Sequence, residues 1–145
     1  DVLALREALA DGTIDIVATD HAPHPHEDKD CEWQAAAFGM LGLETALSIV
    51  QHTMVDTGLI DWAGVAQRMS AKPAEIGRIG GQGRPIAVGE PANIVLYDPA
   101  ATRVVDPTET ASLSRNTPYA GMELPGRVVA TFLRGRPTVL DGKLA

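Results

Sequence analysis

One short stretch of the sequence, VATDHAPHPHEDKD at residues 17–30, crowds three histidines and several acidic side chains behind an apolar run. Asp20 comes directly after that run. If the run is a strand, Asp20 lies at its carboxyl end, where the active sites of α/β barrels and open parallel sheets are found. A carboxylate there can ligate a cation such as zinc, or act as general base on a water that the metal activates. The alternative is that Asp20 caps a turn or a helix, which is a common role for aspartate.

The three histidines differ in what their positions allow. A His-x-His pair on a strand places both rings on one face and is typical of zinc sites. His24 and His26 have that spacing, but Pro25 separates them and they lie in a polar loop, so a metal pair is not predicted. We expect His26 to be a solvated loop residue and His21 to pack or hydrogen-bond beneath the loop. For His24, a contact with a bound ligand and a plain loop role both remain open.

The residues around the histidines have simple structural interpretations. Glu27–Asp30 is a mixed charge run, which is typical of a solvated loop, and Cys31 lacks the base and oriented partner that a nucleophilic thiol requires. Gly39 and Gly42 would let backbone N–H groups approach an anion or polar ring, although an ordinary helix start explains them equally well. Tyr119 is either a phenolic acid or, more simply, a tyrosine packed near a turn.

The first half of the chain predicts helices around one buried strand. A β-branched run at Ile14–Thr19 is apolar on both faces, which favours a strand of a parallel sheet. Apolar residues recur at helical spacing over Leu43–Val55. Asp61 is placed to cap a further helix, and a helical turn is predicted over Pro73–Gly77. The expected apolar stripes of the first and third helices comprise Leu3, Leu5, Ala8 and Leu9, and Trp62, Val65, Ala66 and Met69.

After Gly80 the pattern changes to glycine and proline punctuation around short strands. Strands are predicted at Asn93–Tyr97 and, more briefly, at Val104–Val105. Arg134-Gly135-Arg136 predicts a hairpin turn between RVVATFLRG and PTVLDGKL. These strands are few for an independent sandwich, so we expect strands from elsewhere to complete this half.

Composition limits the partners of the chain. Its 145 residues carry a net charge of −7 with no basic cluster and 4% aromatic residues, so neither nucleic acid nor an anionic membrane is expected to bind. No apolar run approaches the roughly 20 residues of a membrane-spanning helix. A single cysteine excludes an internal disulfide and favours a cytoplasmic location. The first residues lack the pattern of a signal peptide and resemble the last turns of a helix that began earlier.

Four motifs together resemble a known family. They are TDHAPH (Thr19–His24) followed by EDK, AFGMLGLET (Ala37–Thr45), GEPANIVLYDP, and the long block SRNTPYAGMELPGRVVATFLRGRPTVLDGK. The set resembles the dihydroorotases of the amidohydrolase superfamily, and most closely the bacterial type I enzymes. The resemblance covers essentially the whole chain, and the C-terminal block is shared with hydantoinases and allantoinases.

The resemblance implies an α/β fold, namely the C-terminal part of a (β/α)8 metal-dependent hydrolase barrel plus half of a small β-sandwich. Residues 1–80 would form the last strand and final helices of the barrel, with a catalytic loop at residues 19–42. Residues 81–145 would form the C-terminal strands of the sandwich.

The resemblance also assigns roles to four residues. Asp20 would ligate zinc and shuttle the proton, and His24 would contact the substrate together with the backbone of Phe38 and Gly39. Ala37 stands where many relatives have proline, which bears on the local backbone geometry and leaves the role of Asp20 untouched.

The activity that the resemblance implies is zinc-dependent, reversible hydrolysis of dihydroorotate to N-carbamoyl-L-aspartate in pyrimidine (UMP) biosynthesis. One or two zinc ions would need a His-x-His pair on the first barrel strand, further histidines and often a carboxylated lysine or an aspartate. This chain has no first-strand His-x-His, no lysine in a strand-end setting and no second histidine pair. We therefore expect a missing N-terminal part of the barrel as partner, beside a small-molecule substrate, and no activity from these residues alone. The alternatives are a hydantoinase- or allantoinase-like cyclic amidase and a catalytically inactive scaffold subunit. A homodimer is left open.

Overall fold

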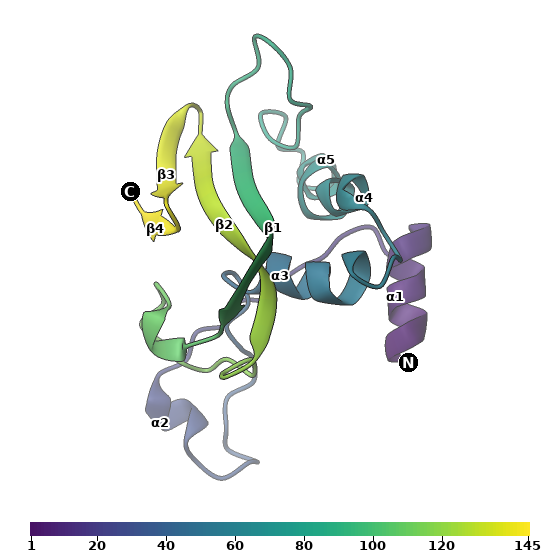
Figure 1. Ribbon diagram of the computed structural model, residues 1–145. Coiled ribbons are helices and arrows are strands. Elements are labelled where there is room, and N and C mark those ends of the chain that lie inside the picture. The colour runs from purple at the N-terminus through teal and green to yellow at the C-terminus, as the bar shows by residue number, and fades with distance from the viewer.

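A computed structural model describes residues 1–145 and places short helical segments beside one antiparallel sheet (Figure 1). The α-helices are α1 (Val2–Asp11), α2 (His26–Lys29), α3 (Ala46–Val50), α4 (Trp62–Ala66) and α5 (Lys72–Ile76). The strands are β1 (Ile94–Val104), β2 (Glu123–Leu133), β3 (Arg136–Leu140) and β4 (Lys143–Leu144), in that spatial order. None of the helices combines the length and the apolar character needed to span a membrane.

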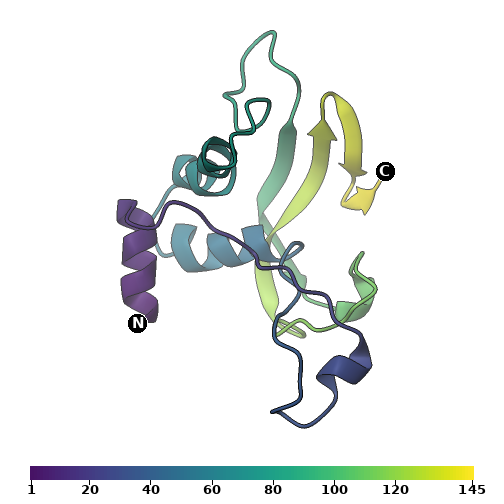
Figure 2. The same cartoon turned by 180° about the vertical axis from the view of Figure 1, so that it is seen from behind.

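The helices gather on one side of the sheet, and two loops mark opposite ends of the molecule. In both views α1 lies farthest from β3 and β4, with α3, α4 and α5 between (Figures 1 and 2). The α2 loop lies at one end together with residues 105–121, whereas residues 77–93 form a loop at the other end. This separation matters because the TDHAPH motif belongs to the α2 end.

The expected helix over Leu43–Val55 is confirmed with a later start and a changed final turn. It begins at Ala46, so Leu43 precedes it and is 63% exposed rather than part of the stripe. Its C-terminal turn, Gln51–Val55, is π-helical. Val50 and Met54 form the core cluster with Val65, against which Leu9 and Met69 pack.

The caps of the next helices follow the sequence closely. The Asp61 carboxylate accepts a hydrogen bond from the Gly64 N–H at 2.7 Å, which confirms it as the cap of α4. A π-helical turn, Gln67–Ala71, joins α4 to α5, and Pro73 stands in the first turn of α5. The expected stripe of α4 is correct for Val65 and wrong for Trp62 and Ala66, which are both exposed.

The predicted strand at Ile14–Thr19 is not formed. The segment has no ladder partner, because the pairing nearest to it is a single parallel bridge between His21 and Met40. Its backbone is tied to helical turns instead: the Ile14 N–H donates to the Ala8 carbonyl of α1 at 2.9 Å, and the Val17 N–H donates to the Arg68 carbonyl at 3.1 Å. A strand exists only through hydrogen bonds to a neighbouring strand, and no strand of this chain pairs with Ile14–Thr19.

The sheet confirms the expected hairpin and corrects the short strand. Arg134 and Gly135 both have positive φ, 52° and 79°, as a two-residue hairpin turn between β2 and β3 requires. Val104 is the last residue of β1 and not a separate strand. A register shift between Asp98 and Thr102 lets β1 pass Pro99 and continue beside β2.

A buried polar contact joins the helices to the sheet. The Tyr97 hydroxyl on β1 donates to Gln51 Oε1 at 2.7 Å, and Gln51 Nε2 donates to the Pro99 carbonyl at 2.9 Å. Gly126 on β2 has φ 80°, and a Cβ there would lie 1.6 Å from the Tyr97 hydroxyl oxygen. Only glycine therefore lets β2 pass this close to Tyr97.

Candidate functional site

Asp20 has a backbone conformation that is rare for a residue with a side chain. Its φ is 44°, in the left-handed region, and its side chain is exposed. Such a conformation is sparsely populated and costs on the order of 1–3 kcal/mol, and such residues cluster at active sites. No helix starts at Asp20, because α2 begins six residues later with Pro25 as its N-cap. The helix-cap alternative is therefore wrong.

His21, the residue after Asp20, is hydrogen-bonded to the backbone that leads into α3. Its Nδ1 accepts hydrogen bonds from the N–H groups of Gly42 at 3.1 Å and Leu43 at 3.4 Å. An accepting Nδ1 carries no proton, so the neutral ring has its hydrogen on Nε2. A Cβ on Gly42 would lie 2.9 Å from the Thr19 carbonyl oxygen, so glycine is needed for this approach. His21 thus hydrogen-bonds beneath the loop, as the sequence predicts.

The Phe38–Gly39 backbone lies directly beside the TDHAPH loop. Gly39 has φ 106°, and a Cβ there would lie 2.5 Å from the Ala22 Cβ and 3.5 Å from His24 Nε2. The Ala22 N–H also donates to the Met40 carbonyl at 2.9 Å. Phe38, the residue before Gly39, is 96% exposed. The structure therefore brings His24 and Gly39 together.

Asn116 joins these two segments, and the sequence offered no local signal for it. Its Oδ1 accepts from the His24 N–H at 3.2 Å, and its Nδ2 donates to the Ala22 carbonyl at 2.8 Å and the Gly39 carbonyl at 3.4 Å. Its own carbonyl accepts from the Leu41 N–H at 3.0 Å. His24 and Asn116 are 92 residues apart, so only the folded chain reveals the contact.

Lys29 corrects the expectation that Glu27–Asp30 is a fully solvated charge run. Its Nζ is half-buried and donates to the carbonyls of Ala37 at 2.7 Å and Gly39 at 3.1 Å. The short helix α2 explains the difference, because it turns Lys29 inward. The same helix leaves His26 outside, with an 84% exposed side chain that pairs with Asp30 at 3.2 Å.

A loop pocket opens between the histidine loop and the segment that carries Asn116. It has a volume of about 410 Å³ and is lined by His24, Pro25, His26, Lys29, Asp30, Leu113, Ser114, Arg115 and Asn116. The Arg115 guanidinium is folded back on its own loop, where it donates to Thr110 Oγ1 and to the carbonyls of Ser112 and Ser114. Asp20 does not line the loop pocket, so this chain does not bring all four predicted site residues into one cavity.

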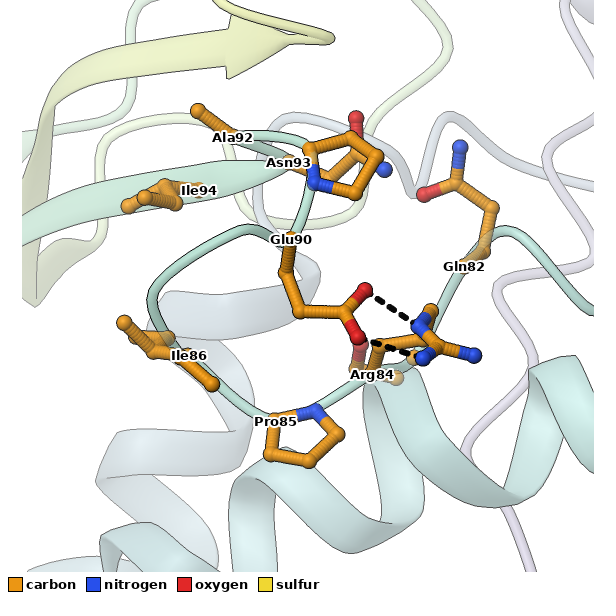
Figure 3. Close-up of a pocket in the computed structure, with 12 residues that line it drawn as sticks. Gln82, Arg84, Pro85, Ile86, Glu90, Ala92, Asn93 and Ile94 are labelled. Carbon is orange, nitrogen blue, oxygen red and sulfur yellow. Dashed lines mark hydrogen bonds and ion pairs between the residues drawn. The ribbon is translucent and has the colours of Figure 1, made fainter.

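A second pocket lies at the opposite end of the molecule and is structural in character (Figure 3). Its two charged side chains, Arg84 and Glu90, are hydrogen-bonded to each other across the loop (Figure 3). These hydrogen bonds hold the pKa of Glu90 below its ordinary value and leave no free base. Asn93 ties the same loop to the hairpin turn by accepting from the Arg134 N–H at 2.8 Å.

This chain brings together no set of side chains that could hold a metal ion by itself. No group of three or more His, Cys, Asp or Glu side chains comes together. Asp20 offers one exposed carboxylate, a group that can bind zinc, but a zinc site uses about three or four protein ligands. Cys31 is exposed and its Sγ contacts only the Asp28 carbonyl, at 3.7 Å. Tyr119 lies in a turn, where its carbonyl accepts from the Met122 N–H at 2.9 Å.

Comparison with known proteins shows to which family this chain belongs. A family model described as the amidohydrolase family matches residues 1–138, and the chain belongs to this family. Among individual proteins it is similar to the dihydroorotase of Streptomyces coelicolor, with 74% identity over 144 residues, and to that of Mycobacterium tuberculosis, with 56% identity. These matches cover 99% of the chain and 34% of each relative, so the chain spans about a third of their length. The resemblance drawn from TDHAPH and its companion motifs is confirmed.

Solved structures of related enzymes have the same fold. The L-hydantoinase of Arthrobacter aurescens aligns with a TM-score of 0.89 at 32% identity, and the D-hydantoinase of a Thermus species with 0.87 at 29% identity. Each alignment covers 99% of this chain and 32% of the other chain. The α/β arrangement with its small antiparallel sheet is therefore one that this family uses.

Proposed function

We propose that this chain forms one wall of the active site of a dihydroorotase, a zinc-dependent cyclic amidohydrolase that reversibly hydrolyses dihydroorotate to N-carbamoyl-L-aspartate in pyrimidine biosynthesis. The observation that carries the proposal is the hydrogen-bonded junction of the TDHAPH loop with Gly39, with Asp20 held at a positive φ at the start of that loop. The identity of 74% to a dihydroorotase supports this substrate over other cyclic amides.

The proposal includes the parts of the protein that surround this wall. Residues 1–80 belong to the end of a (β/α)8 barrel and residues 81–145 to a β-sandwich, and the remaining barrel supplies the other metal ligands. Ile14–Thr19 would then gain its missing ladder from neighbouring barrel strands. A cytoplasmic location and a small-molecule substrate follow from the same proposal.

Asp20 is the proton-transfer group in this proposal. Its exposed carboxylate takes a proton from the attacking water and returns it to the nitrogen that leaves when the amide bond breaks. The same carboxylate would contribute one ligand to zinc, and zinc when bound would supply Lewis-acid polarisation of the amide carbonyl.

His24 and the Phe38–Gly39 backbone hold the substrate. The His24 ring and the Gly39 backbone lie side by side, so a small ring with a carboxylate can contact both at once. A histidine can donate a hydrogen bond to the carboxylate, and a backbone N–H or C=O can pair with the ring amide. The proposal gives no role to the Phe38 side chain, which is exposed in this chain.

The choice of substrate is tested by assaying the full-length protein with dihydroorotate, hydantoin and allantoin. We expect kcat/KM to be highest for dihydroorotate by a factor of about a hundred or more, because a site that pairs with a substrate carboxylate rejects rings that lack it. Equal or faster turnover of hydantoin would overturn the proposed substrate. Absence of turnover together with absence of bound zinc would instead support the inactive scaffold.

A further inference from the structure

The side chain of Asn116 uses both its amide nitrogen and its amide oxygen on the two segments that the proposed function assigns to the substrate. A primary amide has one acceptor oxygen and two donor hydrogens. The oxygen accepts from the His24 N–H, and the nitrogen donates to the carbonyls of Ala22 and Gly39. No shorter side chain reaches all three groups, and a carboxylate of the same shape would present an acceptor where donors are needed.

The three contacts enclose the part of the loop that sets the position of His24. Two of them hold the residues on either side of Pro23, which fixes the peptide units leading into His24. The third pulls the Gly39 carbonyl toward the same amide group. One side chain therefore sets the separation between the His24 ring and the Gly39 backbone.

Asn116 is itself held from two directions. Its carbonyl accepts from the Leu41 N–H at 3.0 Å, and the next residue, Thr117, donates its N–H to the Arg115 carbonyl at 2.8 Å. Asn116 is half-buried beside the loop pocket, so water competes less for its amide than at an open surface. The segment from Val105 onward is anchored to the sheet by the Val105 N–H, which donates to the Met122 carbonyl at 2.9 Å. We call the three side-chain contacts of Asn116 the clamp. The clamp thus ties the proposed substrate loops to the β half of the chain.

We propose that Asn116 is a positioning residue that preorganises His24 and the Gly39 backbone for the cyclic amide. The inference rests on the proposed function. It goes beyond that function by giving Asn116 an indirect part in substrate binding, which it plays through His24 and the Gly39 backbone without touching the substrate.

The first test compares three variants of the full-length protein. Asn116→Ala removes all three side-chain contacts, and Asn116→Asp keeps the acceptor for the His24 N–H but loses both donors. We expect both to lower kcat/KM by roughly ten- to a hundredfold, because misplacing binding groups by about 1 Å has effects of that size, and we expect most of the loss to appear in KM. The control is Thr117→Val, which removes only the contact of Thr117 Oγ1 with the Tyr119 N–H at 3.3 Å. The control should keep the wild-type KM.

The second test asks whether Asn116 acts through His24. His24→Ala alone should raise KM, and Asn116→Ala added to it should raise KM by much less than it does in the wild-type background, because coupled residues are not additive. Fully multiplicative effects would overturn the proposal. So would an Asn116→Ala protein that loses thermal stability but keeps the wild-type KM, since that is the behaviour of a merely structural residue.

A third measurement separates this inference from the proposed function. Hydrogen–deuterium exchange at the His24 N–H needs no turnover, and it should speed up in Asn116→Ala and stay slow in Thr117→Val. A wild-type protein that fails to hydrolyse dihydroorotate would overturn the function even if exchange changes as expected. A wild-type protein that is active, with unchanged exchange in Asn116→Ala, would overturn the clamp alone.

Discussion

The ammonium group of Lys29 lies 3.1 Å from the carbonyl oxygen of Gly39. The same carbonyl accepts from Asn116 at 3.4 Å, so two donors from separate segments converge on one backbone oxygen. Lys29 also donates to the Ala37 carbonyl at 2.7 Å. Lys29 therefore holds the turn at residues 37–39 through two backbone carbonyls.

Replacing Lys29 by methionine should loosen this turn. Met keeps most of the apolar stem and removes the donor, so the Ala37 and Gly39 carbonyls lose a charged partner. We expect the free energy of unfolding to fall by about 1 kcal/mol, the size of a partly exposed hydrogen bond, and KM for dihydroorotate to rise severalfold. Steady-state kinetics and thermal unfolding measure the two effects.

The matched control is Lys72→Met. Lys72 pairs with Glu75 at 2.9 Å on the exposed surface of α5, and such surface pairs contribute little. Its KM should equal that of the wild type. A Lys29→Met protein indistinguishable from this control would show that the Gly39 carbonyl needs no support from Lys29.

Gly39→Ala should impair the site more than a backbone penalty alone explains. An alanine at φ 106° is strained, and its Cβ would also lie 2.5 Å from the Ala22 Cβ, which forces the loop that carries His24 to move. Gly58→Ala is the control, because Gly58 has φ 75° and nothing lies within 4 Å of the added Cβ. The control should be destabilised by about 1–2 kcal/mol with normal kinetics. Gly39→Ala should in addition lose at least about tenfold in kcat/KM, and normal kinetics in both variants would refute the close approach.

Tyr97 should make stability depend on pH at the alkaline end. Burial raises the pKa of its hydroxyl above the ordinary value, so the folded state favours the protonated phenol. The stabilisation is complete below the unfolded-state pKa of about 10 and is lost as pH rises through the higher folded-state value. Melting temperatures at about pH 8 and about pH 10.5 should therefore differ more for the wild type than for Tyr97→Phe.

Tyr97→Phe should also show a cost at neutral pH. The variant leaves Gln51 Oε1 without its donor, which should lower the free energy of unfolding by about 1 kcal/mol or more. The role given to Tyr97 would be contradicted if raising the pH between these two values lowered the melting temperature equally in the wild type and in Tyr97→Phe.

Local patterns predicted the elements whose stability is local. The helical spacing after Leu43, the capping by Asp61 and the positive-φ turn at Arg134-Gly135 are confirmed because each depends on residues within a few positions. Ile14–Thr19 has the composition of a strand, but a strand needs a partner that this chain does not place beside it. The wrong prediction therefore concerned a long-range pairing and not the pattern itself.

The candidate site, too, was predictable from the sequence only in part. The proximity of the TDHAPH loop and Gly39 was implied by family resemblance, while the contacts that produce it come from Asn116 and Lys29. Lys29 looked like part of a solvated charge run, because sequence alone does not say which face of a four-residue helix turns inward. Asn116 lies in a loop without periodicity, so only tertiary contacts identify it.

The most direct test of the central claim is the activity of Asp20→Asn in the full-length protein, with zinc content measured in parallel. Asparagine tolerates a positive φ about as well as aspartate, so the variant should fold normally and change only the carboxylate. Asp28→Asn, an exposed carboxylate in the same loop, is the control and should keep wild-type turnover. We expect Asp20→Asn to lose about a hundredfold or more in kcat for dihydroorotate. Near-normal turnover by Asp20→Asn would contradict the proposed role of this residue in proton transfer.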